Sequence, residues 1–310
     1  MNAIKSKTRI LVTGSKNAFN YFAKRGISIM SSISTRKIQT GNYQTLILEG
    51  GEKSSETIIF LHGSGPGVSA KSNWKDVLPR FQEQFHVVAP DMFGFGNTDH
   101  PETYPNNGVE WMNIRVKQVL DLMDALQIEK AHLVGNSLGG VVSLNLLMYA
   151  PERFDRVVLM GAGGGLTEPT PELAKLASFH KDPNPVAFKN LLSWFLFDES
   201  ILEDELENIV AERLELFLRP EVRKSYEENF SKSQLSDMLV PPSALKKMDA
   251  PILLIHGHED RFVPLESSLY VMNYLPNAQL HTFKRCGHWA QVEQKNRFIK
   301  LSTDFFNGEL

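Results

Sequence analysis

Hydrophobic residues fall into short continuous runs that alternate along the chain with longer segments of helical periodicity. Continuous runs rich in β-branched residues are typical of buried strands, and apolar spacing near 3.6 residues is typical of amphipathic helices. The predicted strands lie at residues 43–49, 57–61, 86–89, 131–134, 157–160, 251–256 and 279–283, and the predicted helices at 109–126, 138–149, 265–274 and 291–306. Strands that alternate with helices form βαβ units, so we expect an α/β fold with a mostly parallel sheet flanked by helices.

This alternation stops near Gly161 and resumes close to residue 249. Between them, residues 166–248 show helical periodicity at 188–197, 204–217 and 221–235, and several prolines separate these segments. The pattern predicts a helical lid over residues 166–248, inserted into a core made of residues 39–165 and 249–310.

Composition and charge narrow the class of protein. Of the 310 residues, 42% are hydrophobic and 22% charged, as in ordinary globular domains. The single cysteine, Cys286, cannot form an internal disulfide. The net charge is −3, but residues 1–48 carry eight Lys and Arg and no acid, which leaves −11 for the remainder. An acidic body argues against nucleic-acid binding, and no segment approaches the ~20 apolar residues of a membrane span.

The basic, Ser- and Thr-rich start of the chain is a separate feature. Residues 1–38 are predicted to form a leader that is either a targeting segment or disordered. We expect a cytoplasmic protein, or a mitochondrial one if this leader is a transit peptide.

The segment 135–140, Gly-Asn-Ser-Leu-Gly-Gly, lies between a predicted strand and a predicted helix. A G-x-S-x-G sequence in that setting is typical of the nucleophile elbow of α/β-hydrolases. The sharp turn exposes the serine, and the helix N-terminus supplies free N–H groups and positive potential. Ser137 is therefore the candidate nucleophile.

A serine nucleophile needs a base that is oriented by an acid, and in this fold the chain order is Ser, acid, His. Asp260 follows a strand after the lid, and Glu259 is the nearest rival, with Asp237 and Asp249 as weaker ones. His288 lies just beyond the last strand and follows the acid. We predict Asp260 and His288 as the partners of Ser137.

The loop 62–67, His-Gly-Ser-Gly-Pro-Gly, follows a buried strand and is rich in glycine. Such a loop can turn backbone N–H groups inward, and one of them pairs with the amide after the nucleophile to form an oxyanion hole. The predicted donors are the amides of Ser64 and Leu138. We expect no metal or organic cofactor, because the sequence shows neither a metal-ligand cluster nor a phosphate-binding loop.

With these segments in place, residues 40–310 resemble the α/β-hydrolases, and most closely the meta-cleavage-product hydrolases, which cleave a C–C bond in 2-hydroxy-6-oxo-hexa-2,4-dienoates. The most distinctive matches are residues 260–264, Asp-Arg-Phe-Val-Pro, and 286–293, Cys-Gly-His-Trp-Ala-Gln-Val-Glu. Leu138 departs from the family, where a larger Phe or Met is usual. The resemblance implies that the substrate pocket is lined by Gly63, Gly65, Asn73, Asn136 and Trp289.

The resemblance also implies a lid arginine that binds the substrate carboxylate. Arg213 is the best match, with Arg219 and Arg223 as neighbours that the sequence does not separate from it. The expected partner is a small anionic dienoate, and the family often forms homo-oligomers. A small-ester carboxylesterase and a hydrolase-fold ligand receptor are the alternatives, because both can share the same framework.

Overall fold

The computed structural model describes residues 32–310, and most of the expected leader lies outside the described residues. Its sheet has eight strands in the order β1-β2-β4-β3-β5-β6-β7-β8, and only the pairings of β1 with β2 and of β2 with β4 are antiparallel. The strands are β1 (Ser34–Thr40), β2 (Tyr43–Gly50), β3 (Thr57–Leu61), β4 (His86–Pro90), β5 (Ala131–Asn136), β6 (Phe154–Met160), β7 (Ile252–Gly257) and β8 (Ala278–Phe283). The arrangement confirms the predicted mostly parallel sheet.

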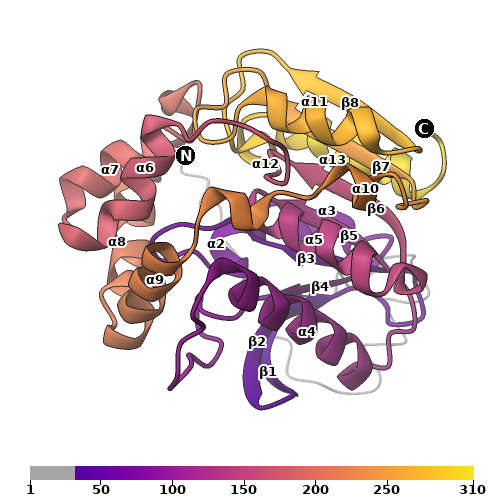
Figure 1. The fold of residues 1–310 in the computed structure, drawn as a ribbon, viewed down its shortest axis with the longest axis horizontal. Helices are drawn as coiled ribbons and strands as arrows, with labels where there is room; N and C mark the ends of the chain where they lie inside the picture. The colour runs from indigo at the N-terminus through magenta and orange to yellow at the C-terminus, as the bar shows by residue number, and fades with distance from the viewer. Residues whose placement is uncertain (1–31) are drawn as a thin grey trace, which may run out of the picture. The chain divides into compact units, whose positions relative to one another are not determined.

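Helices cover both faces of this sheet (Figure 1). One layer contains α4, α5, α10 and α11, and the other contains α2, α3, α12 and α13. The bounds are α2 (Ala70–Trp74), α3 (Leu78–Phe81), α4 (Gly108–Ala125), α5 (Leu138–Tyr149), α10 (Pro242–Leu245), α11 (Leu265–Tyr274), α12 (Ala290–Glu293) and α13 (Lys295–Phe306). Successive residues of a strand point to opposite faces, so Ile59 and Leu61 pack in the first layer while Ile58 and Phe60 pack in the second.

Between β6 and β7, where the lid is expected, the chain forms a cluster of helices with its own hydrophobic centre, for which we keep the name lid. Figure 1 shows α6, α7, α8 and α9 grouped beside the sheet. Their bounds, with those of the short 3-10 turns, are α6 (Pro171–Ser178), η2 (Phe179–Lys181), α7 (Pro185–Ser193), η3 (Glu199–Leu202), α8 (Leu206–Phe217), α9 (Pro220–Lys232) and η4 (Leu235–Met238), and η1 (Pro151–Arg153) precedes β6. Phe262, from the loop after β7, is buried in the same cluster.

Three expectations are corrected by the structure. β1 begins at Ser34, so the boundary of the leader at residue 38 is too late. The expected lid extends to residue 248, but Leu245 and Met248 pack into the layer that contains α11, which confines the lid helices to α6–α9. The single helix expected at 291–306 is broken at Gln294, where φ is −120° and ψ is 34°, into α12 and α13.

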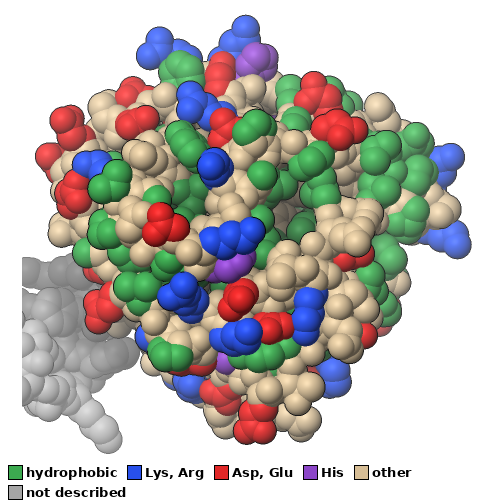
Figure 2. All heavy atoms as spheres, turned by 60° about the vertical axis from the view of Figure 1, so that its left-hand side comes forward, with side chains coloured by type: hydrophobic (Ala, Val, Ile, Leu, Met, Phe, Trp, Pro, Cys, Tyr) green, Lys and Arg blue, Asp and Glu red, His purple; other side chains and the backbone are tan. Residues whose placement is uncertain are grey.

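Charged side chains of both signs are interspersed on the face shown in Figure 2, with hydrophobic side chains between them. Within residues 32–310, no helix is both long enough and apolar enough to span a bilayer.

Candidate active site

Ser137 forms a sharp turn between the end of β5 and the first residue of α5. Its φ of 52° and ψ of −114° are strained for a residue with a β-carbon, and its N–H donates to Met160 O at 2.9 Å. The flanking glycines allow strand and helix to approach closely: a β-carbon placed on Gly135 would lie 2.5 Å from Gly139 O, and one on Gly139 would lie 2.2 Å from Leu61 O. The turn has the geometry of a nucleophile elbow.

The buried side chains of Asp260 and His288 meet beside this turn. His288 Nδ1 lies 2.6 Å from Asp260 Oδ2, and Asp260 Oδ1 accepts the N–H groups of Phe262 at 2.8 Å and Val263 at 3.0 Å. Burial alone would raise the pKa of Asp260, but His288 and these donors hold it below its usual value. The ionised carboxylate can only accept, so His288 Nδ1 carries a proton and Nε2 is left as a base.

Gly161 lies between the histidine–aspartate pair and the elbow. It follows Met160, to which Ser137 is hydrogen bonded, and a β-carbon at its position would lie 3.0 Å from His288 Nδ1 and 3.2 Å from Asp260 Oδ2. The adjacent residues Met160 and Gly161 therefore contact the elbow on one side and the histidine–aspartate pair on the other. In the described part of the chain, the Ser137 hydroxyl makes no hydrogen bond to the imidazole.

The rival acids have other partners. Glu259 accepts the N–H of Cys286 at 3.0 Å, and Asp237 accepts N–H groups of Gly108 and Gln234 at 3.2 and 2.8 Å. Asp249 is exposed. The structure thus favours Asp260 among the four.

The loop after β3 is fixed by the buried ring of His62. Its Nδ1–H donates to Gly63 O at 2.7 Å, and its Nε2 accepts the N–H of Met92 at 2.9 Å. Burial lowers the pKa of His62 to about 4, so the ring is neutral near pH 7. Ser64 and Leu138, the two predicted donors, both border a cavity of about 20 Å³, roughly the space of one water molecule.

Two asparagines flank Gly63 next to this loop. Asn73 Oδ1 accepts the Gly63 N–H at 3.2 Å, while its buried Nδ2 has no partner within residues 32–310. Asn136 donates from Nδ2 to Met160 O at 3.1 Å, and its Oδ1 would lie 2.9 Å from a β-carbon on Gly63. A buried donor without a partner is costly, so Asn73 is suited to a polar ligand.

Arg213 of α8 is buried and reaches the loop after β3. Its Nε and Nη2 donate to Pro66 O at 3.2 and 2.9 Å, and its guanidinium lies 5.5 Å from the Phe188 ring and 5.7 Å from the Trp289 ring. Gly65 is close to the same group, because a β-carbon on Gly65 would lie 3.2 Å from Arg213 Nη2. Among the described residues, no carboxylate forms an ion pair with Arg213. Burial lowers its pKa to about 10.

The two neighbouring arginines differ from Arg213 in exposure and partners. Arg219 pairs with Glu221 at 2.6 Å, and Arg223 is exposed and donates to His180 O at 2.9 Å. Of these three arginines, only Arg213 is buried near the loop after β3 with no carboxylate partner among the described residues. The structure therefore favours Arg213 among the three lid arginines that the sequence did not separate.

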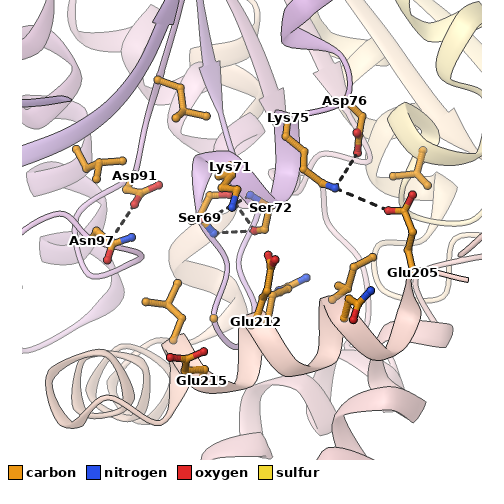
Figure 3. Close-up of a pocket in the computed structure, with 18 of the residues that line it drawn as sticks. Ser69, Lys71, Ser72, Lys75, Asp76, Asp91, Asn97, Glu205, Glu212 and Glu215 are labelled. Carbon is orange, nitrogen blue, oxygen red and sulfur yellow. Dashed lines mark hydrogen bonds and ion pairs between the residues drawn. The ribbon is translucent and has the colours of Figure 1, made fainter. Parts of the chain in front are cut away.

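A larger cleft of about 680 Å³ lies between α2 and α8, where Lys75, just after α2, forms an ion pair with Glu205, just before α8 (Figure 3). Arg213 and Trp289 border this cleft, but Ser137, Asp260 and His288 do not. Because the three predicted catalytic residues lie outside the larger cleft, we place the candidate active site at the elbow.

Two residues near the site were missed by the sequence reasoning. Phe195, between α7 and η3, stacks on Trp289 with ring centroids 4.6 Å apart and accepts the His288 N–H at 2.8 Å. Glu293 of α12 accepts the N–H of Gly287 at 2.6 Å. Both contacts join segments that are remote in the chain, and no local pattern signals them.

Comparison with known proteins gives consistent similarities. Residues 56–295 match the family model described as alpha/beta hydrolase fold. The chain is 36% identical to a 2-hydroxymuconate semialdehyde hydrolase of Pseudomonas sp. (strain CF600), covering 80% of this chain and 86% of that protein. It is also 36% identical to a 2-hydroxy-6-oxo-6-phenylhexa-2,4-dienoate hydrolase of Burkholderia cepacia, over 86% and 93% of the two chains.

Solved structures agree with the sequence relatives. The 2-hydroxy-6-oxo-6-phenylhexa-2,4-dienoate hydrolase of Rhodococcus sp. strain RHA1 superposes with a TM-score of 0.86 at 40% identity, covering 89% of this chain and 99% of that one. A serine hydrolase from the polyaromatic-hydrocarbon-degrading bacterium Cycloclasticus zankles has a TM-score of 0.87 at 41% identity, covering 90% and 99%. The similarity therefore extends over nearly the whole described fold.

Proposed function

Since the chain belongs to the α/β-hydrolase family and, within it, to the meta-cleavage-product C–C bond hydrolases, we propose that its substrate is an anionic 2-hydroxy-6-oxo-hexa-2,4-dienoate. The protein is a hydrolase of a small molecule, and the family acts on ring-fission products of aromatic compounds. The observation that carries the proposal is the buried guanidinium of Arg213, which has no carboxylate partner among residues 32–310. A substrate carboxylate would supply that missing charge.

The neighbouring polar groups support the same substrate. The unpartnered Asn73 Nδ2 is available to a carboxylate or an enol oxygen. Arg213 and Asn73 both contact the loop after β3, through Pro66 O and the Gly63 N–H. We assign these two side chains, with Asn136, Trp289 and the Gly63–Gly65 backbone, to the binding of the dienoate.

The proposed reaction begins with conversion of the bound dienol to its keto tautomer. Ser137 Oγ then attacks the remote carbonyl carbon, its proton passes to His288 Nε2, and Asp260 stabilises the imidazolium. The oxyanion accepts hydrogen bonds from the backbone N–H groups of Ser64 and Leu138. The C–C bond breaks with its electron pair moving onto the conjugated keto acid, which takes the proton. Water hydrolyses the Ser137 ester, so the products are a carboxylic acid and a 2-hydroxydienoate.

A spectrophotometric assay tests this assignment. Purified protein is mixed with a panel of yellow ring-fission products and, in parallel, with p-nitrophenyl esters. We expect kcat/KM for at least one dienoate to exceed that for the esters, and Ser137→Ala to abolish turnover of both. Turnover of esters alone would favour the carboxylesterase alternative, and activity that survives Ser137→Ala would refute every role given to this serine.

The relatives described above are bacterial proteins, and the comparisons give no support to a mitochondrial address.

A further inference from the structure

One carboxylate connects the loop that carries His288 with the lid. Glu293 Oε1 accepts the Gly287 N–H at 2.6 Å, and Glu293 Oε2 accepts the N–H groups of Phe197 at 2.8 Å and Asp198 at 3.2 Å. Gly287 immediately precedes His288, whereas Phe197 and Asp198 lie in the lid between α7 and η3. A single side chain of α12 therefore holds both segments.

The lid also contacts the histidine directly. Phe195 O accepts the His288 N–H at 2.8 Å, and the Phe195 ring lies 5.6 Å from the imidazole. A β-carbon on Gly287 would lie only 2.5 Å from Phe195 O, so the two backbones are in close contact. The position of the imidazole thus depends on how residues 195–198 are held against residues 287–288.

The chemistry of this contact requires a carboxylate. Three backbone N–H groups donate to Glu293, the Cys286 thiol also interacts with it, and an ionised carboxylate offers only acceptors. Burial raises the pKa of Glu293, while the three N–H groups favour its ionised form. A glutamine at this position would turn its NH₂ group toward either Gly287 or the lid, and two donors would then face each other. Glutamine keeps the size of the side chain but loses the hydrogen bonds either to Gly287 or to the lid.

We propose that Glu293 is a positioning residue that couples the lid to the catalytic imidazole, so that His288 reaches its working position only when residues 195–198 are attached. The proposal rests on the role assigned to His288 above. It goes beyond that role, since it makes the lid a part of the general base's support as well as a cover for the substrate.

The test compares Glu293→Gln with Glu205→Gln as the matched control. Glu205 also joins the lid to the core, through an exposed ion pair at 3.7 Å with Lys75, which follows α2. Among the described residues, no hydrogen bond or ion pair links Glu205 to residues 285–288. Both variants keep the size of the side chain. For each, kcat and KM are measured with a dienoate, folding by thermal unfolding, and the rate of Ser137 phosphorylation with diisopropyl fluorophosphate.

The labelling reaction reports on the imidazole without the dienoate, because Ser137 Oγ attacks phosphorus, fluoride leaves and His288 takes the proton. We expect Glu293→Gln to lower kcat by about 10- to 100-fold with KM changed less than about threefold, and to slow labelling by a similar factor. Glu205→Gln should remain within about twofold of the parent in both measurements.

Several results would overturn the proposal: an unchanged kcat and labelling rate in folded Glu293→Gln, an equal loss in Glu205→Gln, or a change in KM alone. If Glu293→Gln does not fold, the comparison uses Glu293→Asp, which keeps the charge but shortens the side chain and should lower kcat and the labelling rate together; parent-like values of both would overturn the proposal. Failure of both to fold would make Glu293 purely structural. If the parent turns over no dienoate but labelling still depends on Glu293, the substrate assignment fails and the positioning role stands.

Discussion

Replacing Arg213 with methionine should weaken turnover of the substrate strongly and change the stability of the fold little. Methionine fills a similar volume and removes the charge, and Arg213 has no carboxylate partner among the described residues. Burial lowers the pKa of the guanidinium from its ordinary value to about 10. A difference of that size corresponds to a cost of about 3 kcal/mol for keeping the charged form buried.

Removing the buried charge should stabilise the variant, and losing the hydrogen bonds of Arg213 should destabilise it. Pro66 O accepts from both Nε and Nη2 of Arg213, and an unpaired buried carbonyl costs about 1–3 kcal/mol. The two effects are of similar size, so we expect Arg213→Met to change the free energy of unfolding by less than about 2 kcal/mol. A buried arginine usually costs far more to remove when it has an ionic partner.

Activity should respond much more strongly than stability. Breaking a buried ion pair with the substrate carboxylate costs roughly 3–5 kcal/mol, which corresponds to a loss in kcat/KM of at least about 10²-fold. A p-nitrophenyl ester has no carboxylate, so its turnover should change little. Arg223→Met, at an exposed position of α9, is the control for removing a lid arginine.

The assays are urea denaturation and steady-state kinetics with both substrates. Equal losses on the dienoate and the ester would refute the pairing of Arg213 with a carboxylate. Destabilisation by several kcal/mol would show that the guanidinium serves the fold, and the proposed substrate would then lose its main support.

Two further predictions concern the imidazole and acid stability. Gly161→Ala should lower kcat at least about tenfold, because its β-carbon would lie 3.0 Å from His288 Nδ1. Gly308→Ala is the control, since Gly308 is also at positive φ (+75°) and its replacement should cost stability alone. Thermal unfolding checks that both variants fold, and equal kcat values in the two would contradict this prediction. Burial would raise the pKa of Glu49, but hydrogen bonds from Arg36 and His86 lower it to about 2, so its ionised form stabilises the fold above pH 4.5 and this contribution is lost as the pH falls toward 2. Glu49→Gln should reduce the free energy of unfolding at pH 7 by about 1–3 kcal/mol and flatten its pH dependence in urea titrations, and parallel curves for parent and variant would exclude this role.

Local patterns were sufficient for several elements of the core. β3 (Thr57–Leu61), α5 (Leu138–Tyr149) and α11 (Leu265–Tyr274) have the predicted bounds, because continuous or periodic apolar residues define them. The edge strand β1 was not predicted, since its residues are mostly exposed and carry no such signal. The start of α7 at Pro185 instead of residue 188 reflects a cap: Asn184 accepts the Ala187 N–H at 2.9 Å.

The sequence by itself determined the chemistry available to this protein: an elbow serine, an acid and a histidine in the order that one fold uses, and a glycine-rich loop beside them. Tertiary structure decided which groups meet. It placed Asp260, and not Glu259, against His288, buried Arg213 without a carboxylate partner within residues 32–310, and placed Glu293 against the lid. These contacts join residues tens to hundreds of positions apart, and they leave no periodicity in the chain because each involves single groups from two distant segments.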